Sequence, residues 1–275
     1  MRPVLFLCAV TASQAAAQGP SWDNSGNGLL NGTYYFREVV YTVSDNVGSL
    51  SRALAVYGNI TFDGNGGYTI ANGQVLDSQS GGFPQSFSMS GTYSIAASGY
   101  GFFTNPLSSS GSTYTVYGLV TNGIFVGSTT EHGFNDLFVA APVSSPAATN
   151  ASFQGSYTID GFLPGGSPAN AADTTFQLNP DGAGNLGTVS ISGYFGGDSS
   201  NKYLQSSPGV KYSFRDGAGV ITFPNSNTAN FYAGQEYMYI SPDGNFVFGG
   251  SPNDFDIFVG VKNTSNVNFS GMYYE

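Results

Sequence analysis

The sequence is poor in the residues on which most enzyme chemistry depends. Among 275 residues it has one cysteine (Cys8), one histidine (His132) and one tryptophan (Trp22). Zinc sites need clusters of Cys or His, and a Ser-His-Asp or Cys-His arrangement needs a histidine beside its nucleophile. His132 would have to serve any such site alone. We therefore predict that the protein is not an enzyme and uses no cofactor.

Charge is scarce as well. Asp, Glu, Lys and Arg make up 9% of the chain, the formal net charge is −10, and the seven basic residues are scattered. Without a basic stripe to neutralise phosphates, nucleic acid is excluded as a partner. The 22 Phe and 18 Tyr supply large apolar surfaces, which argues for folded domains and against a disordered chain.

Long apolar runs are missing too. Val4–Val10 is far shorter than the ~20 residues that span a bilayer. With Arg2 before it and Ala15-Ala16-Ala17 after it, this run predicts a secretory signal peptide over residues 1–18, cleaved near Ala17-Gln18. The protein is then secreted and extracellular, or held at the cell surface, with no membrane span. Because Cys8 lies inside the signal, the exported chain has no disulfide and depends on its cores alone.

What the sequence does contain is a phrase that occurs three times, with the pattern apolar-x-Gly-x-Tyr. The copies are Leu30-Asn31-Gly32-Thr33-Tyr34, Phe153-Gln154-Gly155-Ser156-Tyr157 and Phe269-Ser270-Gly271-Met272-Tyr273. Other phrases match in the same order. Asp63-Gly64-Asn65-Gly66 corresponds to Asp181-Gly182-Ala183-Gly184, and Asp136-Leu137-Phe138-Val139 corresponds to Asp256-Ile257-Phe258-Val259. Such ordered self-similarity indicates a duplicated structural unit.

Each unit consists of short runs of alternating apolar and polar residues, separated by Gly, Asn and Asp turns. This pattern predicts antiparallel strands, about eight per unit, and no helix longer than a turn or two. The fold class is therefore all-β, with two tandem antiparallel domains, each a small barrel or a curled sandwich. We place the N-terminal linker at 19–28, β-domain 1 at 29–142, a linker at 143–150 and β-domain 2 at 151–263.

Residues 264–275 carry the third phrase, with Gly271 and Tyr273, and two interpretations are open. The segment is the first strand of a third repeat in a longer array. Alternatively, it is an exchanged strand that pairs with an open sheet edge of another copy or a neighbouring domain.

The remaining candidate residues favour structural roles. Gly32, Tyr34, Gly155 and Tyr157 are expected at turns and in cores, and Asp136 and Asp256 at strand ends, bonded to nearby main-chain N–H groups. Asp63, Asp181 and Asp216 each begin a glycine turn. A carboxylate near turn carbonyls makes them weak calcium candidates, but a full ligand set is missing, so the turn interpretation is preferred.

Two further candidates concern carbohydrates. Glu131 with Asp136, or Asp254 with Asp256, has the composition of a glycosidase pair, although such short spacing is common by chance. Trp22 is either a sugar-stacking residue or a linker aromatic, and the linker interpretation is preferred.

The apolar-x-Gly-x-Tyr strand, the Asp-Gly-x-Gly turn and the phrase Gly91-Thr92-Tyr93-Ser94 together resemble uncharacterised secreted bacterial proteins built from tandem β-domains. The strand count is also similar to that of small lipocalin- or avidin-like barrels, although Tyr34 and Tyr157 stand where lipocalins carry a tryptophan. The resemblance implies no catalytic residues. We expect a secreted or cell-surface structural or adhesive protein. The alternative is a module that binds a glycan or an apolar small molecule, and a secreted hydrolase ranks last.

Overall fold

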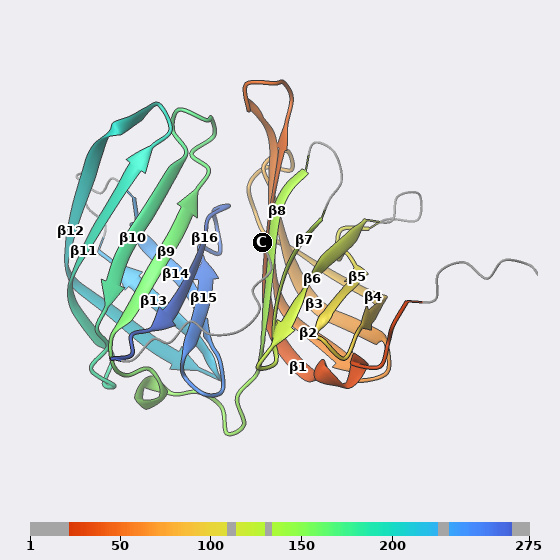
Figure 1. The fold of residues 1–275 in the computed structure, drawn as a ribbon. Helices are drawn as coiled ribbons and strands as arrows, with labels where there is room; N and C mark the ends of the chain where they lie inside the picture. Colours follow the sequence, from red (N-terminus) through yellow and green to blue (C-terminus); the bar gives the residue numbers. More distant parts are fainter. Residues whose placement is uncertain (1–21, 109–113, 130–133, 225–230, 266–275) are drawn as a thin grey trace, which may run out of the picture.

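The computed structural model describes residues 22–108, 114–129, 134–224 and 231–265 (Figure 1). The expected signal peptide, Glu131, His132, and the third phrase with Gly271 and Tyr273 lie outside the described residues.

The chain forms two closed antiparallel barrels of eight strands each. The first consists of β1 (Asn31–Val43), β2 (Leu50–Asp63), β3 (Gly67–Asp77), β4 (Gln85–Ile95), β5 (Tyr100–Thr104), β6 (Thr115–Thr121), β7 (Ile124–Thr129) and β8 (Phe134–Pro142). The second consists of β9 (Tyr157–Leu163), β10 (Ala172–Leu178), β11 (Asn185–Phe195), β12 (Asp198–Arg215), β13 (Ala218–Phe223), β14 (Gly234–Ile240), β15 (Phe246–Gly250) and β16 (Ile257–Lys262).

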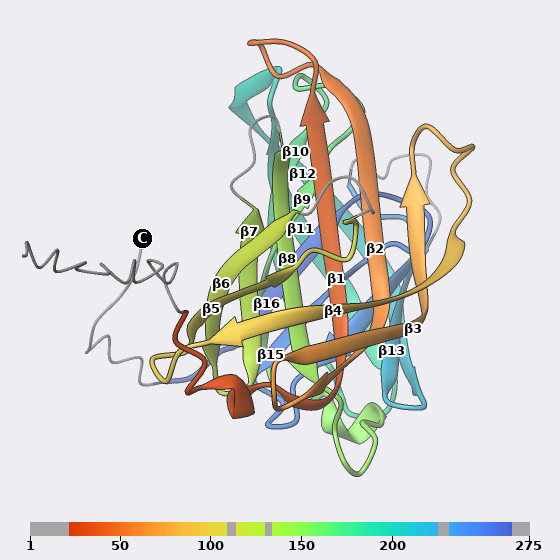
Figure 2. The ribbon, with the colours of Figure 1, turned by 90° about the vertical axis from the view of Figure 1, so that its right-hand side faces the viewer.

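Each strand pairs with the next in sequence, and the first strand of each barrel pairs with its last, β1 with β8 and β9 with β16. The predicted fold class is confirmed, and each domain is a barrel rather than a sandwich. Closure leaves no unpaired sheet edge among these strands. Figure 2 shows β1 to β4 of the first barrel toward the viewer, with the second barrel behind.

The repeated phrase occupies the same place in both barrels. Gly32 and Gly155 both have positive φ, +93° and +102°, which favours glycine at this position. A single 3-10 turn precedes each phrase, η1 (Asn27–Leu29) and η2 (Asn150–Ser152).

Matching hydrogen bonds fix these two turns. The Tyr93 hydroxyl donates to the carbonyls of Asn27 (3.2 Å) and Leu30 (2.9 Å). Tyr212 does the same in the second barrel, with the carbonyls of Asn150 and Phe153, both at 3.3 Å.

Asn27 and Asn150, the first residues of these two turns, bond equivalent main-chain N–H groups in the two barrels. The Asn27 side chain accepts from the Ile95 N–H, and the Asn150 side chain accepts from the Phe214 N–H. Asn27 and Asn150 therefore belong to the barrels, although the sequence placed them in linkers.

Aromatic side chains fill both interiors. In the first barrel, the fully buried rings include Phe36, Phe62, Phe103, Phe125 and Phe138. In the second, buried aromatics include Phe153, Tyr157, Tyr212, Phe223 and Tyr232. A barrel of eight strands is just wide enough for side chains to fill it or for one small ligand to bind, and in both barrels these rings occupy the interior.

Inward-facing glycines make room for some of these rings. A Cβ atom on Gly118 would lie 2.6 Å from the Phe125 ring, and one on Gly249 would lie 2.7 Å from the Phe258 ring. Both distances are shorter than van der Waals contact, so these glycines are part of the packing.

Prediction from the fold. Tyr93→Phe and Tyr212→Phe each remove a hydroxyl that bonds two main-chain carbonyls, so each is expected to destabilise the protein by about 1–3 kcal/mol. Urea unfolding followed by circular dichroism measures the loss. Tyr194→Phe, at a tyrosine that is 40% exposed, is the matched control and should change little. Equal stability of all three variants would contradict the shared role of the two buried tyrosines.

Candidate functional site

The most distinctive arrangement lies between the barrels. The outer faces of β1, β2 and β8 pack against β14, β15 and β16, and bury one shared apolar cluster. Its buried members are Tyr35, Val39, Ala55, Leu76, Val139, Ala141, Tyr239, Phe248 and Ile257. The Tyr35 and Tyr239 rings stack with their centroids 4.6 Å apart. Because this contact is apolar, it resembles an obligate interface more than a mobile domain junction.

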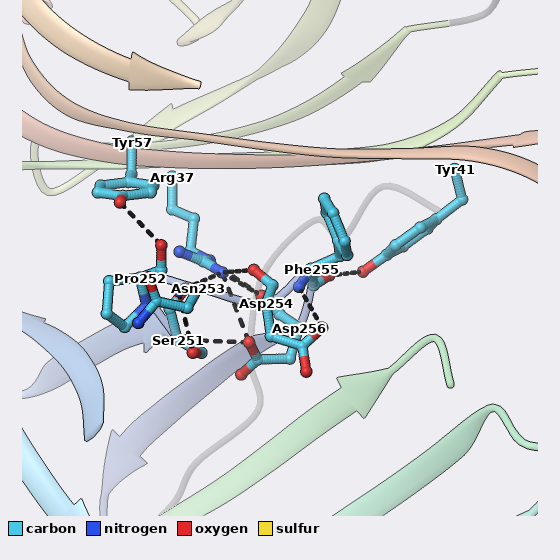
Figure 3. A network of polar contacts seen from close by, with 9 residues as sticks. All are labelled: Arg37, Tyr41, Tyr57, Ser251, Pro252, Asn253, Asp254, Phe255 and Asp256. Carbon is cyan, nitrogen blue, oxygen red and sulfur yellow. Dashed lines mark hydrogen bonds and ion pairs between the residues drawn. The ribbon is translucent and has the colours of Figure 1, made fainter. Parts of the chain in front are cut away.

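One charged side chain crosses this interface (Figure 3). Arg37 of β1 is 1% exposed. Its Nε donates to the carbonyl oxygen of Asp256 at 2.9 Å, and one terminal nitrogen donates to the same oxygen at 2.7 Å and to the carbonyl of Ser251 at 3.0 Å. The same nitrogen lies 3.6 Å from the Asp256 carboxylate. The fixed fork of guanidinium donors suits such convergent acceptors.

Two tyrosines of the first barrel hold the same loop of the second, residues 251–256. The Tyr57 hydroxyl donates to the Pro252 carbonyl at 3.0 Å, and the Tyr41 hydroxyl donates to the Phe255 carbonyl (Figure 3). We call Arg37, Tyr41 and Tyr57 with the loop 251–256 the clasp. The acceptors are mainly main-chain carbonyls, so the clasp recognises the shape of the loop and fixes the relative position of the barrels.

The clasp is not duplicated among the described residues. Arg37 pairs with Val139, and the residue that pairs with the matching Val259 is Asp160. Asp160 is exposed and has the opposite charge. The duplication therefore preserved the barrel but not this contact.

A buried carboxyl pair lies behind the clasp, inside the second barrel. Glu236 of β14 and Asp256 are 4% and 3% exposed. Burial raises the pKa of both carboxyl groups. The neighbouring Asp256 carboxylate raises the pKa of Glu236 further, and the Arg37 guanidinium opposes the rise in the pKa of Asp256. Glu236 Oε2 and Asp256 Oδ2 are buried and have no hydrogen-bond partner.

The first barrel has a similar buried acid. Glu38 of β1 is 0% exposed, and its Oε1 accepts from the Asn105 side chain. Burial, and then the nearby Asp136 carboxylate, raise the pKa of Glu38 to about 8. Glu38 is therefore mostly protonated at neutral pH.

The strand-start aspartates also hold their neighbouring loops. Asp136 accepts from the Thr129 N–H at 2.8 Å and from the Ser128 hydroxyl at 2.9 Å. Asp256 accepts from the Ser251 N–H at 2.9 Å. Their carboxyl neighbours are Glu38 and Glu236, which come from other strands and were not apparent in the sequence. Asp254, the sequence-proximal candidate partner of Asp256, is exposed on the loop.

The calcium candidates form turns. Asp63 accepts from the N–H groups of Asn65 and Gly67, at 2.7 and 2.9 Å. Asp181 repeats this geometry at 2.7 and 2.9 Å with Ala183 and Asn185. Asp216 is exposed, and its carbonyl accepts from the Tyr35 hydroxyl at 2.9 Å. Within the described part of the chain, no group of three His, Cys, Asp or Glu side chains is placed to hold a metal ion.

A groove lies beside the clasp, between the start of β2 and the loop that joins β9 to β10. One part has a volume of about 380 Å³ and is lined by Leu50, Leu163, Phe195 and Phe255, among others. An adjoining part of about 290 Å³ shares Leu50 and Pro164 and adds Tyr41 and Phe162. The lining is mostly apolar, and clefts at domain interfaces are common ligand sites. No motif in the sequence indicated this groove, because it is assembled from both barrels.

No protein-family model matches the sequence, and no curated protein matches it. One similar solved structure is a double mutant of the vaccine antigen transferrin binding protein B from Haemophilus parasuis Hp5. It is 12% identical with a TM-score of 0.32, and the match covers 79% of this chain and 54% of that one, about half its length.

Two other structures are comparable. A DUF3598-family protein of unknown function from Nostoc punctiforme PCC 73102 is 9% identical, with a TM-score of 0.24 and coverage of 86% of this chain and 99% of that one. The isotype 1 transferrin binding protein B from serogroup B Neisseria meningitidis is 10% identical, with a TM-score of 0.26 and coverage of 85% and 77%. At these scores the likenesses carry no argument about function. Among the described residues, no helix has the length and apolar character needed to cross a membrane.

Prediction for the clasp. Arg37→Met keeps much of the side-chain volume but leaves the loop carbonyls and the Asp256 carboxylate without their donor. We expect a loss of about 3–5 kcal/mol, the usual result of removing one partner of a buried charged contact, and separate unfolding of the two barrels. Scanning calorimetry tests this, because the intact protein should unfold in a single transition.

The matched control is Arg52→Met. Arg52 forms a two-point ion pair with Asp77, but its side chain is 42% exposed, so its loss should cost less than about 1 kcal/mol. If Arg37→Met and Arg52→Met unfold alike, the clasp does not couple the barrels.

Prediction for pH. Between the ordinary glutamate pKa of 4.5 and the raised pKa of about 8, folded Glu38 holds a proton that the unfolded chain has released. Stability therefore falls as pH rises through this window, by about 1.4 kcal/mol per pH unit for one proton. Glu38→Gln imitates the protonated form, so the variant should lose this slope and be more stable than the parent at pH 8. Urea titrations at pH 5, 6.5 and 8 measure the free energy of unfolding of the parent and the variant. If the free energy of unfolding of Glu38→Gln changes with pH as steeply as that of the parent, the prediction is wrong.

Proposed function

We propose that the chain is a non-enzymatic, exported structural or adhesive protein whose two barrels work as one rigid body. The observation that carries this proposal is the clasp. Arg37 is buried across the interface and bonds a loop of the other barrel. A buried guanidinium is costly to desolvate, so this contact supports a fixed geometry between the barrels rather than a flexible chain of modules.

The filled interiors support the same conclusion. Where aromatic rings occupy the barrel axis, recognition falls to outer sheet faces and loops. A rigid pair of barrels presents such surfaces at a constant spacing, which favours simultaneous attachment at more than one point. The buried carboxyl groups lie under the clasp or inside a core, so they serve stability in this proposal and not hydrolysis. Export rests on the signal peptide proposed for residues 1–18.

The second candidate function is binding of an apolar small molecule. The specific observation in its favour is the groove beside the clasp, with Leu50, Leu163 and Phe255 in its lining. Saturable binding of a hydrophobic dye such as Nile red, abolished by Leu163→Arg, would favour this alternative.

Prediction for function. Beads coated with the exported chain, residues 19–275, should be retained under flow by surfaces that carry extracellular glycans or by the producing cells. Arg37→Met beads should lose most of this retention, because the barrels no longer hold their spacing, while Arg52→Met beads should keep it. Equal retention of the two variants, absence of retention by the parent protein, or release of soluble sugar from the surface would each contradict the proposal.

A further inference from the structure

An apolar patch lies on the outer surface of the first barrel, beside the strands that contact the second barrel. It adjoins that interface at β7, where Ile124 packs against the shared cluster. We call it the β5–β7 face. Its members are Tyr100 and Phe102 of β5, Tyr117 and Leu119 of β6, Val126 of β7, and Trp22 from the segment before β1. Trp22, Tyr100 and Val126 are 60%, 51% and 42% exposed. In Figure 1, β5 lies on the side of this barrel that is turned away from its neighbour.

The aromatic members of this face contact one another. The Trp22 ring meets the Phe102 ring edge-on at 4.9 Å between centroids, and Phe102 lies 5.9 Å from Tyr117. Cross-strand pairing adds Tyr100 opposite Leu119, and Leu119 opposite Val126. The patch is therefore continuous over three strands.

The face is also uncharged. The strands β5, β6 and β7 contain no Asp, Glu, Lys or Arg, although the whole chain has a net charge of −10. Depletion of charge together with enrichment in aromatic residues distinguishes the centre of a protein–protein interface from ordinary surface. A contiguous patch of this kind indicates an interaction site more often than chance exposure.

The duplication shows what such a face does in the other barrel. Leu119 pairs with Val126 across β6 and β7, and in the second barrel Tyr239 pairs with Phe248 across β14 and β15. Tyr239 and Phe248 are 5% and 0% exposed, because they pack against the first barrel. Leu119 and Val126 are thus the counterparts of two residues that already serve in a barrel–barrel interface.

The partner of the β5–β7 face can be inferred by comparing it with the other outer faces of the two barrels. The outer face of β1, β2 and β8, which covers Tyr239 and Phe248 of the second barrel, is already occupied. The outer faces of β9, β11 and β12 also expose Phe162, Tyr194 and Leu204. Exposed charges lie beside these residues, at Asp160, Asp173, Lys202 and Lys211. An uncharged apolar face gains little by covering these charges.

The face that matches the β5–β7 face best is therefore the same face of a second copy. We propose that two copies of this chain associate through their β5–β7 faces, about a two-fold axis. Such an isologous contact places each apolar patch on its equal and closes without forming a filament. It also keeps apart the charged surfaces of two acidic molecules. This inference does not depend on the proposed adhesive function.

Sedimentation velocity of the exported chain, residues 19–275, over a wide range of concentration tests the proposal. The parent protein should form a dimer that dissociates on dilution. Leu119→Lys and Phe102→Lys should each raise the dimer dissociation constant at least about a hundredfold, because each places a charge at the centre of the contact. Thr175→Lys, an equal change on the exposed outer face of β10, is the matched control and should leave the dimer intact.

Circular dichroism melting checks that each lysine variant is folded. If one is not, Tyr100→Ser removes an exposed ring without adding charge and should weaken the dimer in the same direction. A parent protein that stays monomeric at every concentration overturns the proposal, and so does a dimer that the β5–β7 variants leave unchanged. A monomer that binds a soluble glycan through Trp22 overturns it as well, because the face would then be a carbohydrate platform.

Discussion

The architecture of this protein depends on a guanidinium group that has been removed from water. Arg37 projects from the outside of one barrel into the other, where three carbonyl oxygens and the Asp256 carboxylate surround it. An unpaired charge in such a place would be strongly unfavourable, so the loop 251–256 and the arginine must be present together. Because each barrel closes on itself, no shared sheet joins the two. The clasp and the apolar cluster around it perform this role.

The filled interiors of the two barrels explain why recognition depends on their outer faces. Phenylalanine and tyrosine rings fill both barrels, and inward glycines such as Gly118 and Gly249 give them space. With the axes occupied, the outer faces are the surfaces left for recognition. One outer face of each barrel is used for the internal contact, and the β5–β7 face of the first barrel is apolar as well and remains exposed.

Duplication and divergence can be separated residue by residue. Parts that close a barrel are present twice, among them the Tyr93 and Tyr212 hydroxyl contacts and the Asp63 and Asp181 turns. Parts that join the barrels occur once in the described structure, since Asp160 occupies the position that matches Arg37. The buried acids are conserved only in part between the two barrels. Asp136 and Asp256 correspond, but their partners Glu38 and Glu236 come from non-equivalent strands.

The sequence by itself determined the fold class, because alternation, turn residues and an ordered repeat are local properties that survive without coordinates. It also indicated the turns at Asp63 and Asp181, whose hydrogen bonds reach only two to four residues along the chain. It did not reveal the full length of β12, since residues 198–209 are mostly polar and show little apolar alternation. Arg37 gave no signal either, because a lone arginine in a strand looks the same whether solvent or a second barrel covers it. Only the tertiary structure decided the clasp, the carboxyl pairs and the groove, because each joins residues far apart in sequence through burial, which a linear pattern does not record.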